Sequence, residues 1–467
     1  MEVEIESLDL AGDGVARSGR RTIAVPFTIP GERVLVRLGA RARVDGVVPA
    51  HLIDVLRPSP HRVTPGCPHF GPQAAGLEPC GGCAWQHIAY PEQLRIKTDL
   101  VTRLVRAAAS SAPAAQAMLA ATPLDTPWRY RHKVHFVFGS TGGRRPRLVM
   151  GHYARGSRRT IDVYQCPVHA DAGNMRAFAL RDACARSGVQ AAAPAGGAQA
   201  ARGTLKSVTV RVARRTAERM MTVVVTGDAD RALRLATRRA MAETGDGTAL
   251  HVNVHPKADG FIFGRDTRRI SGAERLRDEV AGLSFLLSPT SFFQTNVDAA
   301  EVLVELVRRA APEGVPVLDL YAGAGLFALP LARAGHAVVA VEENAVAVAD
   351  GEASRALNRI PPERCRWVRA TVESALARVG AFDTVVLDPP REGCSPAVSQ
   401  RLFAERRPSR VVYVSCNPET LARDLAVAAG QGYAVESLQP VDMFPHTPHV
   451  ETVAVLSRRP PARRAGN

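Results

Sequence analysis

The C-terminal part of the chain alternates short apolar runs with Ala- and Leu-rich stretches, and this alternation constrains the fold more than any other feature. It begins near Ala281 and includes the strand-like runs PVLDL, HAVVAVEEN and VVYVS. Apolar runs of this length between helical patterns indicate parallel strands connected by helices. We therefore predict an α/β fold for residues 276–459, with a doubly wound, Rossmann-like sheet. Residues 460–467 are expected to form a tail.

The segment PVLDLYAGAGLFALPLARAG, residues 316–335, combines a strand, a glycine turn and a helix. Gly323 and Gly325 allow the backbone to turn tightly and to approach a ligand where side chains would clash. Glu342 ends the next strand, 23 residues after Asp319. A carboxylate at this point can bind the ribose hydroxyls of an adenosine cofactor.

Two further features distinguish among adenosine cofactors. The third position after the second glycine is Ala328, so the dinucleotide pattern G-x-G-x-x-G is incomplete, and no P-loop Gly-Lys-Ser/Thr follows. A later strand in AFDTVVLDPPREG ends with Asp388, Pro389 and Pro390. Together these features favour a methyltransferase domain that binds S-adenosylmethionine.

Cys416 lies where the apolar run VVYV ends and a helical pattern begins. A side chain at this point of a doubly wound sheet points into the cleft at the strand ends. Methylation of a pyrimidine carbon needs a thiolate that adds to C6 and makes C5 nucleophilic, and then a base that removes the C5 proton. The segment DMFPHTPHVETVAVL supplies four candidate bases: Asp442, His446, His449 and Glu451.

The first 58 residues contain several short strand-like runs separated by Gly and Pro turns, which predict a small, OB-like β-barrel. Residues 59–275 read as an α+β domain because strand-like runs such as KVHFVFG and RMMTVVVTG follow a helical pattern around residues 91–110. We expect this helix to pack on the catalytic domain.

The positive charge of the chain is concentrated in its middle. The whole sequence has 60 basic and 45 acidic residues, a net charge of +15, and residues 125–275 alone hold 27 basic and 12 acidic residues, again +15. Residues 126–161 contain nine basic residues and no acid. A basic surface can simply maintain solubility, but nucleic acid is the preferred interpretation because Arg neutralises phosphates.

Eight cysteines in a chain of 467 residues argue against a secreted disulfide scaffold and for metal-binding or catalytic thiols. Cys67, Cys80 and Cys83 form a C-x12-C-x2-C pattern, and Cys166 follows in VYQCPVH. Four thiolates suit zinc or an iron–sulfur cluster, and the spacing alone does not separate the two.

The segments DLYAGAGLFALPLA, DPPREG, SCNPETLARDL and DMFPHTPHVETVAVL resemble those of the bacterial RNA uracil-5-methyltransferases. The resemblance covers nearly the whole chain, because the first 58 residues are similar to the TRAM domain, an RNA-binding barrel. It implies that Cys416 is the nucleophile and Glu451 the base. It also assigns S-adenosylmethionine binding to Gln294, Tyr321, Glu342 and Asp388.

For Cys67, Cys80, Cys83 and Cys166, the resemblance favours a [4Fe-4S] cluster over zinc. The chain departs from the family at Leu326, where some members have Asn, and in VRATVES, which lacks a frequent acidic residue. These departures concern the contacts to the methionine and adenine ends of the cofactor.

We expect an S-adenosylmethionine-dependent enzyme that forms 5-methyluridine in structured RNA, with ribosomal RNA favoured over transfer RNA. The alternatives are an RNA-binding or RNA-folding protein without catalysis and an RNA cytosine-5 methyltransferase. No apolar run approaches the length of a membrane span, and the acidic N-terminus is unlike a signal peptide. The expected location is therefore the cytoplasm, without membrane partners, and the expected state is a monomer.

Overall fold

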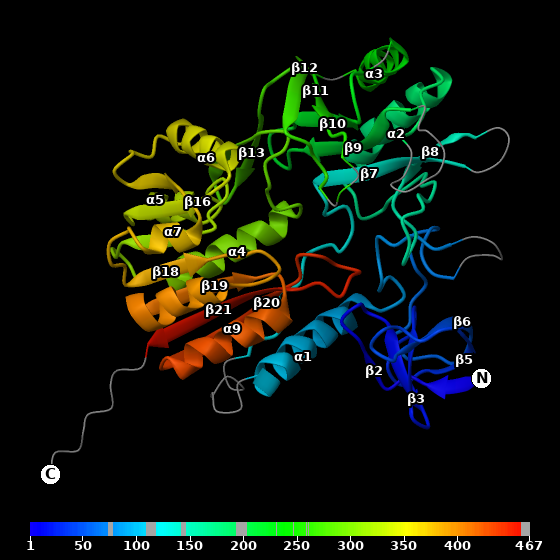
Figure 1. The fold of residues 1–467 in the computed structure, drawn as a ribbon, viewed down its shortest axis with the longest axis horizontal. Helices are drawn as coiled ribbons and strands as arrows, with labels where there is room; N and C mark the ends of the chain where they lie inside the picture. Colours follow the sequence, from blue (N-terminus) through cyan, green and yellow to red (C-terminus); the bar gives the residue numbers. More distant parts are fainter. Residues whose placement is uncertain are drawn as a thin grey trace.

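The computed structural model describes residues 1–72, 78–108, 118–141, 146–192, 203–229, 231–245, 247–257, 259 and 261–458. Figure 1 shows a β-rich N-terminal part, a central sheet with two helices and a C-terminal α/β part. The expected tail at 460–467 lies outside the described residues. Within the described ranges, every helix is too short or too polar to cross a membrane.

The N-terminal part is a six-stranded sheet in the order β1-β5-β6-β4-β3-β2. Alternating apolar side chains, including Ile5, Ile23 and Val34, point to one side and form a small separate core. This pattern explains why short strands with Gly turns are stable here. The strands are β1 (Glu2–Glu4), β2 (Ser7–Leu8), β3 (Gly14–Ser18), β4 (Arg21–Val25), β5 (Arg33–Leu38) and β6 (Val48–Arg57).

Helix α1 (Tyr90–Ala108) follows the segment that bears the first three cysteines of the chain. Its Val101 and Val105 are completely or almost completely buried in the core of the C-terminal part. Helix α1 packs against α9 (Pro418–Gly430), so a segment from the first quarter of the chain covers the C-terminal sheet (Figure 1).

The central part is a six-stranded sheet in the order β12-β11-β10-β9-β7-β8. Helices α2 (Asp171–Arg186) and α3 (Arg231–Thr244) share a core with one of its faces. Its opposite face carries polar side chains, among them His135 and Thr209, which are hydrogen-bonded to each other at 2.9 Å. The strands are β7 (Lys133–Ser140), β8 (Leu148–Gly151), β9 (Leu205–Val212), β10 (Arg219–Val225), β11 (Ala249–Val254) and β12 (Asp266–Ser271).

The C-terminal part has a seven-stranded sheet in the order β17-β16-β15-β18-β19-β21-β20. Strand β21 runs opposite to the other six, which are parallel to one another. This is the doubly wound α/β architecture that the alternating pattern predicted. The strands are β15 (Val317–Leu320), β16 (Val338–Glu342), β17 (Cys365–Arg369), β18 (Thr384–Leu387), β19 (Arg410–Ser415), β20 (Tyr433–Val441) and β21 (Glu451–Arg458).

Helices cover both faces of this sheet, and each face has its own apolar core. The hairpin β13–β14 (Leu276–Val280 and Leu283–Leu287) packs on the same face as α4 and α5. Helix α1, α7, α8, a π-helical turn and α9 cover the other face. The remaining bounds are α4 (Val297–Ala310), α5 (Ala328–Arg333), α6 (Ala345–Leu357), α7 (Val372–Leu376), α8 (Pro396–Ser399) and the π-helical turn (Gln400–Arg406).

Candidate active site

Cys416 occupies the turn between β19 and α9. β19 ends at Ser415, and Asn417 caps the helix by accepting the backbone N–H of Glu419 at 3.0 Å. The side-chain amide of Asn417 also donates to the carbonyl of Arg391 at 3.0 Å. The cap therefore fixes the turn and ties it to the loop after β18, while the thiol stays half-buried.

Glu451 and Cys416 both adjoin the end of the β19–β21 ladder. The last pair of this antiparallel ladder is Ser415 with Thr452, and Cys416 follows Ser415 while Glu451 precedes Thr452. Glu451 is 3% exposed. Burial, and after it the charge of Asp388, raises the pKa of its carboxyl to about 8. The site thus holds a thiol beside a carboxyl group that can exchange a proton near neutral pH.

The thiol of Cys416 is electrostatically linked to three neighbouring groups. Burial raises its pKa to about 12, and the carboxylates of Glu451 and Asp388 add to this effect, whereas the guanidinium of Arg391 opposes it. The thiol is therefore protonated at neutral pH in the free protein, and it needs a proton acceptor before it can act as a nucleophile.

Asp388 follows β18 at the carboxyl end of the sheet. Its backbone N–H donates to the carbonyl of Leu320 at 3.3 Å, which joins the loop after β18 to the end of β15. Burial raises the pKa of its carboxyl to about 7. The predicted cofactor residue Asp388 thus lies between the thiol and the glycine turn.

The glycine turn after β15 is held by Glu342, the last residue of β16. The Glu342 carboxylate accepts the backbone N–H of Gly323 at 2.9 Å and that of Asn344 at 2.7 Å. Tyr321, the first residue after β15, has φ 61°, a conformation that is costly for a side chain with a Cβ. Tyr321 and Glu342, both predicted to bind the cofactor, therefore frame the same turn at adjacent strand ends.

Trp367 on β17 lies beneath this turn, which the sequence did not indicate. A Cβ added at Gly325, where φ is 91°, would lie 2.8 Å from the Trp367 ring, and one at Gly351 of α6 would lie 2.3 Å from it. The indole N–H donates to the carbonyl of Gly323 at 3.4 Å. Two glycines are needed here because the indole ring takes the space of their side chains.

Gln294 lies on a different element, the segment between β14 and α4. Its side chain is buried, whereas Phe292 is 68% exposed. Arg211 of β9 donates to the carbonyl of Ser291 at 2.8 Å, and the backbone N–H of His132 donates to the carbonyl of Thr295 at 2.7 Å. The central sheet therefore positions the segment that carries Gln294.

The four candidate bases occupy different environments. Asp442 forms a buried ion pair with Lys97 through Oδ1 at 2.5 Å, whereas its Oδ2 is buried with no hydrogen-bond partner among the described residues. Burial lowers the pKa of His446 to about 4, which leaves its ring neutral. His449 is exposed. Glu451 has a buried carboxylate oxygen with no hydrogen-bond partner among the described residues, so it is the candidate with a free acceptor next to Cys416.

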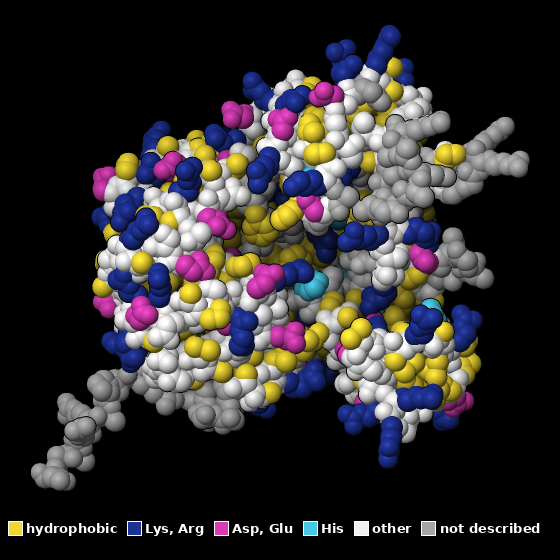
Figure 2. Space-filling view, viewed as in Figure 1, with side chains coloured by type: hydrophobic (Ala, Val, Ile, Leu, Met, Phe, Trp, Pro, Cys, Tyr) yellow, Lys and Arg dark blue, Asp and Glu magenta, His cyan; other side chains and the backbone are white. Residues whose placement is uncertain are grey.

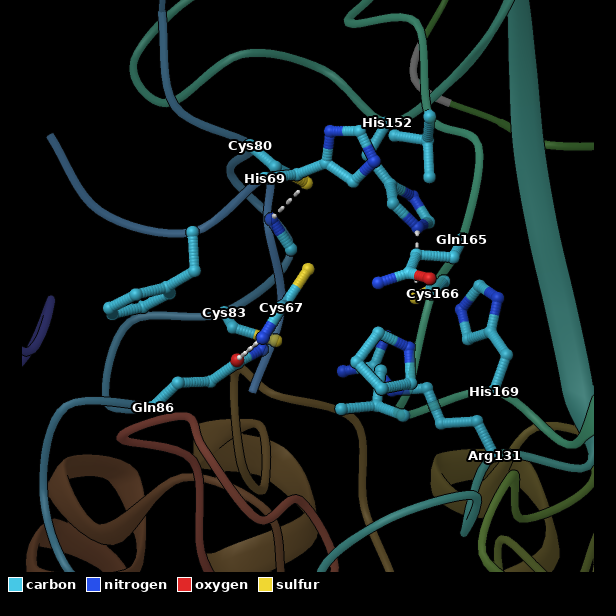
Figure 3. Close-up of a pocket in the computed structure, with 15 residues that line it drawn as sticks. Cys67, His69, Cys80, Cys83, Gln86, Arg131, His152, Gln165, Cys166 and His169 are labelled. Atoms are coloured by element: carbon cyan, nitrogen blue, oxygen red, sulfur yellow. Dashed lines mark hydrogen bonds between the residues drawn. The ribbon is translucent and has the colours of Figure 1, made fainter. Parts of the chain in front are cut away.

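A second cluster of side chains lines a cavity between the cysteine-bearing segment and the central part. Figure 3 shows the sulfurs of Cys67, Cys80, Cys83 and Cys166 directed into the same cavity. All four cysteines are free. Burial raises the pKa of each thiol, and the charges of neighbouring cysteines add to the shift for Cys67, Cys80 and Cys166. The structure therefore brings together the four residues that the sequence singled out.

Histidines and an arginine complete the wall of this cavity. Among the described residues, the donor atoms of His152, Cys166 and His169 lie within 4.8 Å of one another, a group that the sequence did not indicate. His152 Nε2 lies 3.8 Å from Cys166 Sγ. Burial raises the pKa of Cys83, and the guanidinium of Arg131 opposes part of this rise.

The surface in Figure 2 is hollowed where the three parts meet, and Lys and Arg side chains lie along this hollow together with acidic and apolar ones. Among family models, residues 248–459 match tRNA (Uracil-5-)-methyltransferase, and residues 1–60 match the TRAM domain of tRNA (uracil(54)-C(5))-methyltransferase.

Relatives match along almost the full chain. An uncharacterized RNA methyltransferase of Gloeobacter violaceus is 35% identical over 98% of this chain and 96% of its own length, and one of Thermosynechococcus vestitus is 35% identical over 98% of both chains. The crystal structure of the Pyrococcus abyssi tRNA (uracil-54, C5)-methyltransferase with S-adenosyl-L-homocysteine has a TM-score of 0.77 and 27% identity, covering 98% of this chain and 100% of that chain. The chain belongs to the RNA uracil-5-methyltransferase family.

Membership confirms three expectations about this methyltransferase. It is an S-adenosylmethionine-dependent enzyme of RNA, its N-terminal part is a TRAM domain, and its C-terminal part is a Rossmann-like methyltransferase domain. The specific roles of Cys416, Glu451, Gln294 and the cofactor-binding residues remain predictions. Arg391 directly follows the Asp-Pro-Pro motif in the sequence, and in the structure its charge acts on the thiol of Cys416.

Proposed function

We propose that this methyltransferase forms 5-methyluridine in structured RNA, with Cys416 as the nucleophile and Glu451 as the base. The observation that carries the proposal is that Cys416 and Glu451 adjoin the last pair of the β19–β21 ladder, Ser415 with Thr452, and that the charge of Glu451 acts on the Cys416 thiol. A uridine must leave its stack to reach the thiol, which costs a few kcal/mol and favours loops over perfect duplexes.

The reaction needs three bonding changes at the uracil ring. The Cys416 thiol gives its proton to solvent and its Sγ bonds to C6, while the π pair of the C5–C6 double bond moves to C5 and forms the new bond to the methyl group. The bound cofactor supplies that methyl as an electrophile and leaves as S-adenosylhomocysteine. Glu451 then takes the C5 proton, the C5–C6 double bond re-forms, and the Sγ–C6 bond breaks.

Electrostatics of the free site set the protonation of the proposed base. Burial raises the pKa of Glu451 to about 8, so the ionised form, which can accept the C5 proton, is the larger fraction only above that pH. Arg391 favours the thiolate of Cys416 and so offsets part of the effect of the two carboxylates. Asp388, Tyr321, Glu342 and Gln294 are proposed to bind the cofactor at the strand ends.

Substitution of the nucleophile tests this proposal. Cys416→Ala should bind RNA and cofactor as the unaltered protein does, yet incorporate no label from methyl-labelled S-adenosylmethionine into total cellular RNA. Mass analysis of nucleosides from the unaltered enzyme's product should show 5-methyluridine. Label in 5-methylcytidine would indicate a cytosine enzyme, and no label at all would indicate an RNA-binding protein without catalysis.

The class of RNA is the finer part of the proposal. The cysteine cavity and the TRAM domain together led us to favour ribosomal RNA. The solved Pyrococcus abyssi relative is a transfer RNA enzyme with a matching TRAM domain, so this domain no longer separates the two classes. Mapping 5-methyluridine in ribosomal and transfer RNA from cells with and without the gene identifies the substrate, and loss from transfer RNA alone would overturn the preference.

We also propose that Cys67, Cys80, Cys83 and Cys166 hold a [4Fe-4S] cluster, with zinc as the alternative. Among the described residues, the wall of the cavity holds four cysteines outside any disulfide and no carboxylate, a soft donor set that suits either group. Cys166 also has the imidazoles of His152 and His169 beside it, with the three donor atoms within 4.8 Å of one another.

Purification without oxygen tests the metal assignment. We expect a brown protein with about four iron atoms per chain, and Cys83→Ser should lose both the colour and the iron. A colourless protein with one zinc per chain would establish the alternative. We also expect the protein to be a monomer, and light scattering on the same sample measures its molecular mass in solution.

A further inference from the structure

Residues 442–450 connect β20 to β21 without regular secondary structure. The two strands pair with each other up to the ends of this segment, where Val441 faces Glu451. Most of the segment is buried, although its residues form no helix or strand. Backbone groups in such a segment need partners from elsewhere in the protein. Glu451, the proposed base, is the first residue after it.

Four successive carbonyls of the segment accept hydrogen bonds from four other parts of the chain. The donors come from the cysteine-bearing segment, α1, the start of the central part and the N-terminal cap of α4. Met443 accepts from Asn296 Nδ2 (2.9 Å), Phe444 from Lys97 Nζ (3.0 Å), Pro445 from the Tyr130 hydroxyl (3.0 Å), and His446 from the backbone N–H groups of Ala84 and Trp85 (2.9 Å each).

Two side chains of α1, Lys97 and Gln93, also contact side chains of the 442–450 segment. Lys97 pairs with Asp442 at 2.5 Å, and both side chains are fully buried. Gln93 accepts the backbone N–H of His446 at 2.8 Å, and its amide nitrogen lies 3.2 Å from His446 Nδ1. His446 has φ 64°, so these bonds hold a backbone conformation that is unfavourable for a residue with a Cβ.

We propose that Lys97 and Gln93 are positioning residues for the elimination step, because they hold the 442–450 segment and thereby the placement of Glu451. The proposal rests on the proposed function, in which Glu451 removes the C5 proton. A base must lie within hydrogen-bond reach of its proton, and a displacement of about 1 Å costs about 10²-fold in rate. Neither residue was indicated by the sequence as part of the reaction.

The chemistry gives the proposal a distinctive readout. Addition of Cys416 and methyl transfer precede the base step, so a displaced Glu451 leaves the enzyme bonded to the methylated uridine through the Sγ–C6 bond. This adduct survives denaturation in detergent and migrates as a protein–RNA species on a gel. General loss of folding lowers adduct formation and turnover together, whereas loss of positioning raises the adduct and lowers turnover.

The experiment compares three variants of the full-length protein on the RNA that the unaltered enzyme methylates. Glu451→Gln sets the reference for a missing base. Lys97→Met and Gln93→Leu should each lower steady-state turnover about tenfold or more. In both, the fraction of enzyme trapped as adduct should rise at least about fivefold, while the affinity for S-adenosylhomocysteine stays within about twofold of that of the unaltered enzyme.

Asp99→Asn is the matched control, because it breaks an ion pair of α1 with Arg95 (2.6 Å) on the exposed side of the helix. It should leave turnover and adduct unchanged. If Lys97→Met loses its cooperative melting transition because Asp442 is left unpaired, Gln93→Leu carries the test, since it changes no charge.

The outcomes separate this proposal from the proposed function. Failure of Glu451→Gln to accumulate adduct would overturn the role of Glu451 itself. Accumulation in Glu451→Gln without accumulation in folded Lys97→Met or Gln93→Leu would overturn the positioning role alone. Parallel loss of adduct and turnover in the α1 variants would also overturn it, because that pattern marks a structural role only.

Discussion

The thiol of Cys416 and the carboxyl of Glu451 hold their protons more tightly than isolated groups do, with pKa values of about 12 and about 8. Burial is the main cause for both, and the neighbouring Asp388 carboxylate adds to it. Each charge in this cluster therefore changes the readiness of the others to ionise. The proposed nucleophile and the proposed base are therefore one electrostatic unit and not two independent groups.

This coupling predicts opposite effects for two substitutions. Glu451→Gln removes a negative neighbour of the Cys416 thiolate and should lower the pKa of the thiol, by roughly one unit. Arg391→Ala removes a positive neighbour and should raise that pKa by a similar amount. The pH dependence of Cys416 alkylation, followed by mass analysis of its peptide in the absence of RNA, measures both shifts. Shifts in the same direction would contradict the described arrangement.

Single residues were predictable from the sequence where a local motif marks them. Cys416 stands out because a thiol follows an apolar strand, and Glu451 because an acid opens the last one. The effect of Arg391 on the thiol could not be predicted in this way, because it depends on the loop that Asn417 ties to the turn of Cys416. The choice among the four candidate bases likewise depended on contacts in three dimensions, such as the ion pair between Lys97 and Asp442. These two residues are 345 residues apart in the sequence.

At the scale of elements, the glycine turn, α6 and β17 meet around one indole ring. Trp367 touches the positions where Gly325 and Gly351 would carry side chains, and it donates to the carbonyl of Gly323. The shape of the proposed cofactor turn therefore depends on a residue two strands away in the sheet order, on β17.

Filling this space should distort the turn. In Gly351→Ala, the new Cβ would lie 2.3 Å from the Trp367 ring, so the indole must shift, at a cost of about 1–3 kcal/mol in stability. We expect a lower melting temperature and a several-fold weaker affinity for S-adenosylhomocysteine by calorimetry. Gly380→Ala is the control, since nothing lies within 4 Å of its added Cβ. Unchanged affinity in Gly351→Ala would contradict the dependence of the turn on Trp367.

Helices and strands with a regular spacing of apolar residues could be predicted from the sequence, but the elements that they pack against could not. The alternation of apolar strands and helices predicted the doubly wound sheet because each strand there is buried on both faces. The helix near residues 91–110 was visible from its apolar spacing, and its docking on the catalytic part was an expectation. Trp367 could not be predicted, because its contacts join β17 to α6 and the glycine turn through packing that leaves no sequence pattern.

At the scale of the molecule, the charge excess of the chain resides in residues 125–275, the region that forms the central sheet and its helices. Lys and Arg side chains also lie along the hollow between the three parts (Figure 2). Binding of RNA across this surface would release counterions from the phosphates. Charge and not base identity would then dominate the affinity.

Salt should therefore weaken RNA binding strongly. For Cys416→Ala, which binds without turnover, we expect the affinity for substrate RNA to fall about 100-fold or more between 50 and 200 mM KCl, the size expected for several phosphate contacts. Filter binding or anisotropy measures this change. The affinity for S-adenosylhomocysteine over the same range serves as the control and should change little. A drop of less than about tenfold for RNA would contradict a charge-dominated interface.

The contact between α1 and the 442–450 segment also has a consequence for biosynthesis. Gln93 and His446 are 353 residues apart, and a ribosome that adds about 5–20 residues per second makes the second of them roughly 20–70 seconds after the first. During that interval Lys97 has no Asp442, and the apolar side of α1 has no sheet to cover. The apolar side of α1 must therefore stay exposed without aggregating until β20 and β21 have been synthesised. Folding of α1 into its final position thus depends on synthesis of these two strands.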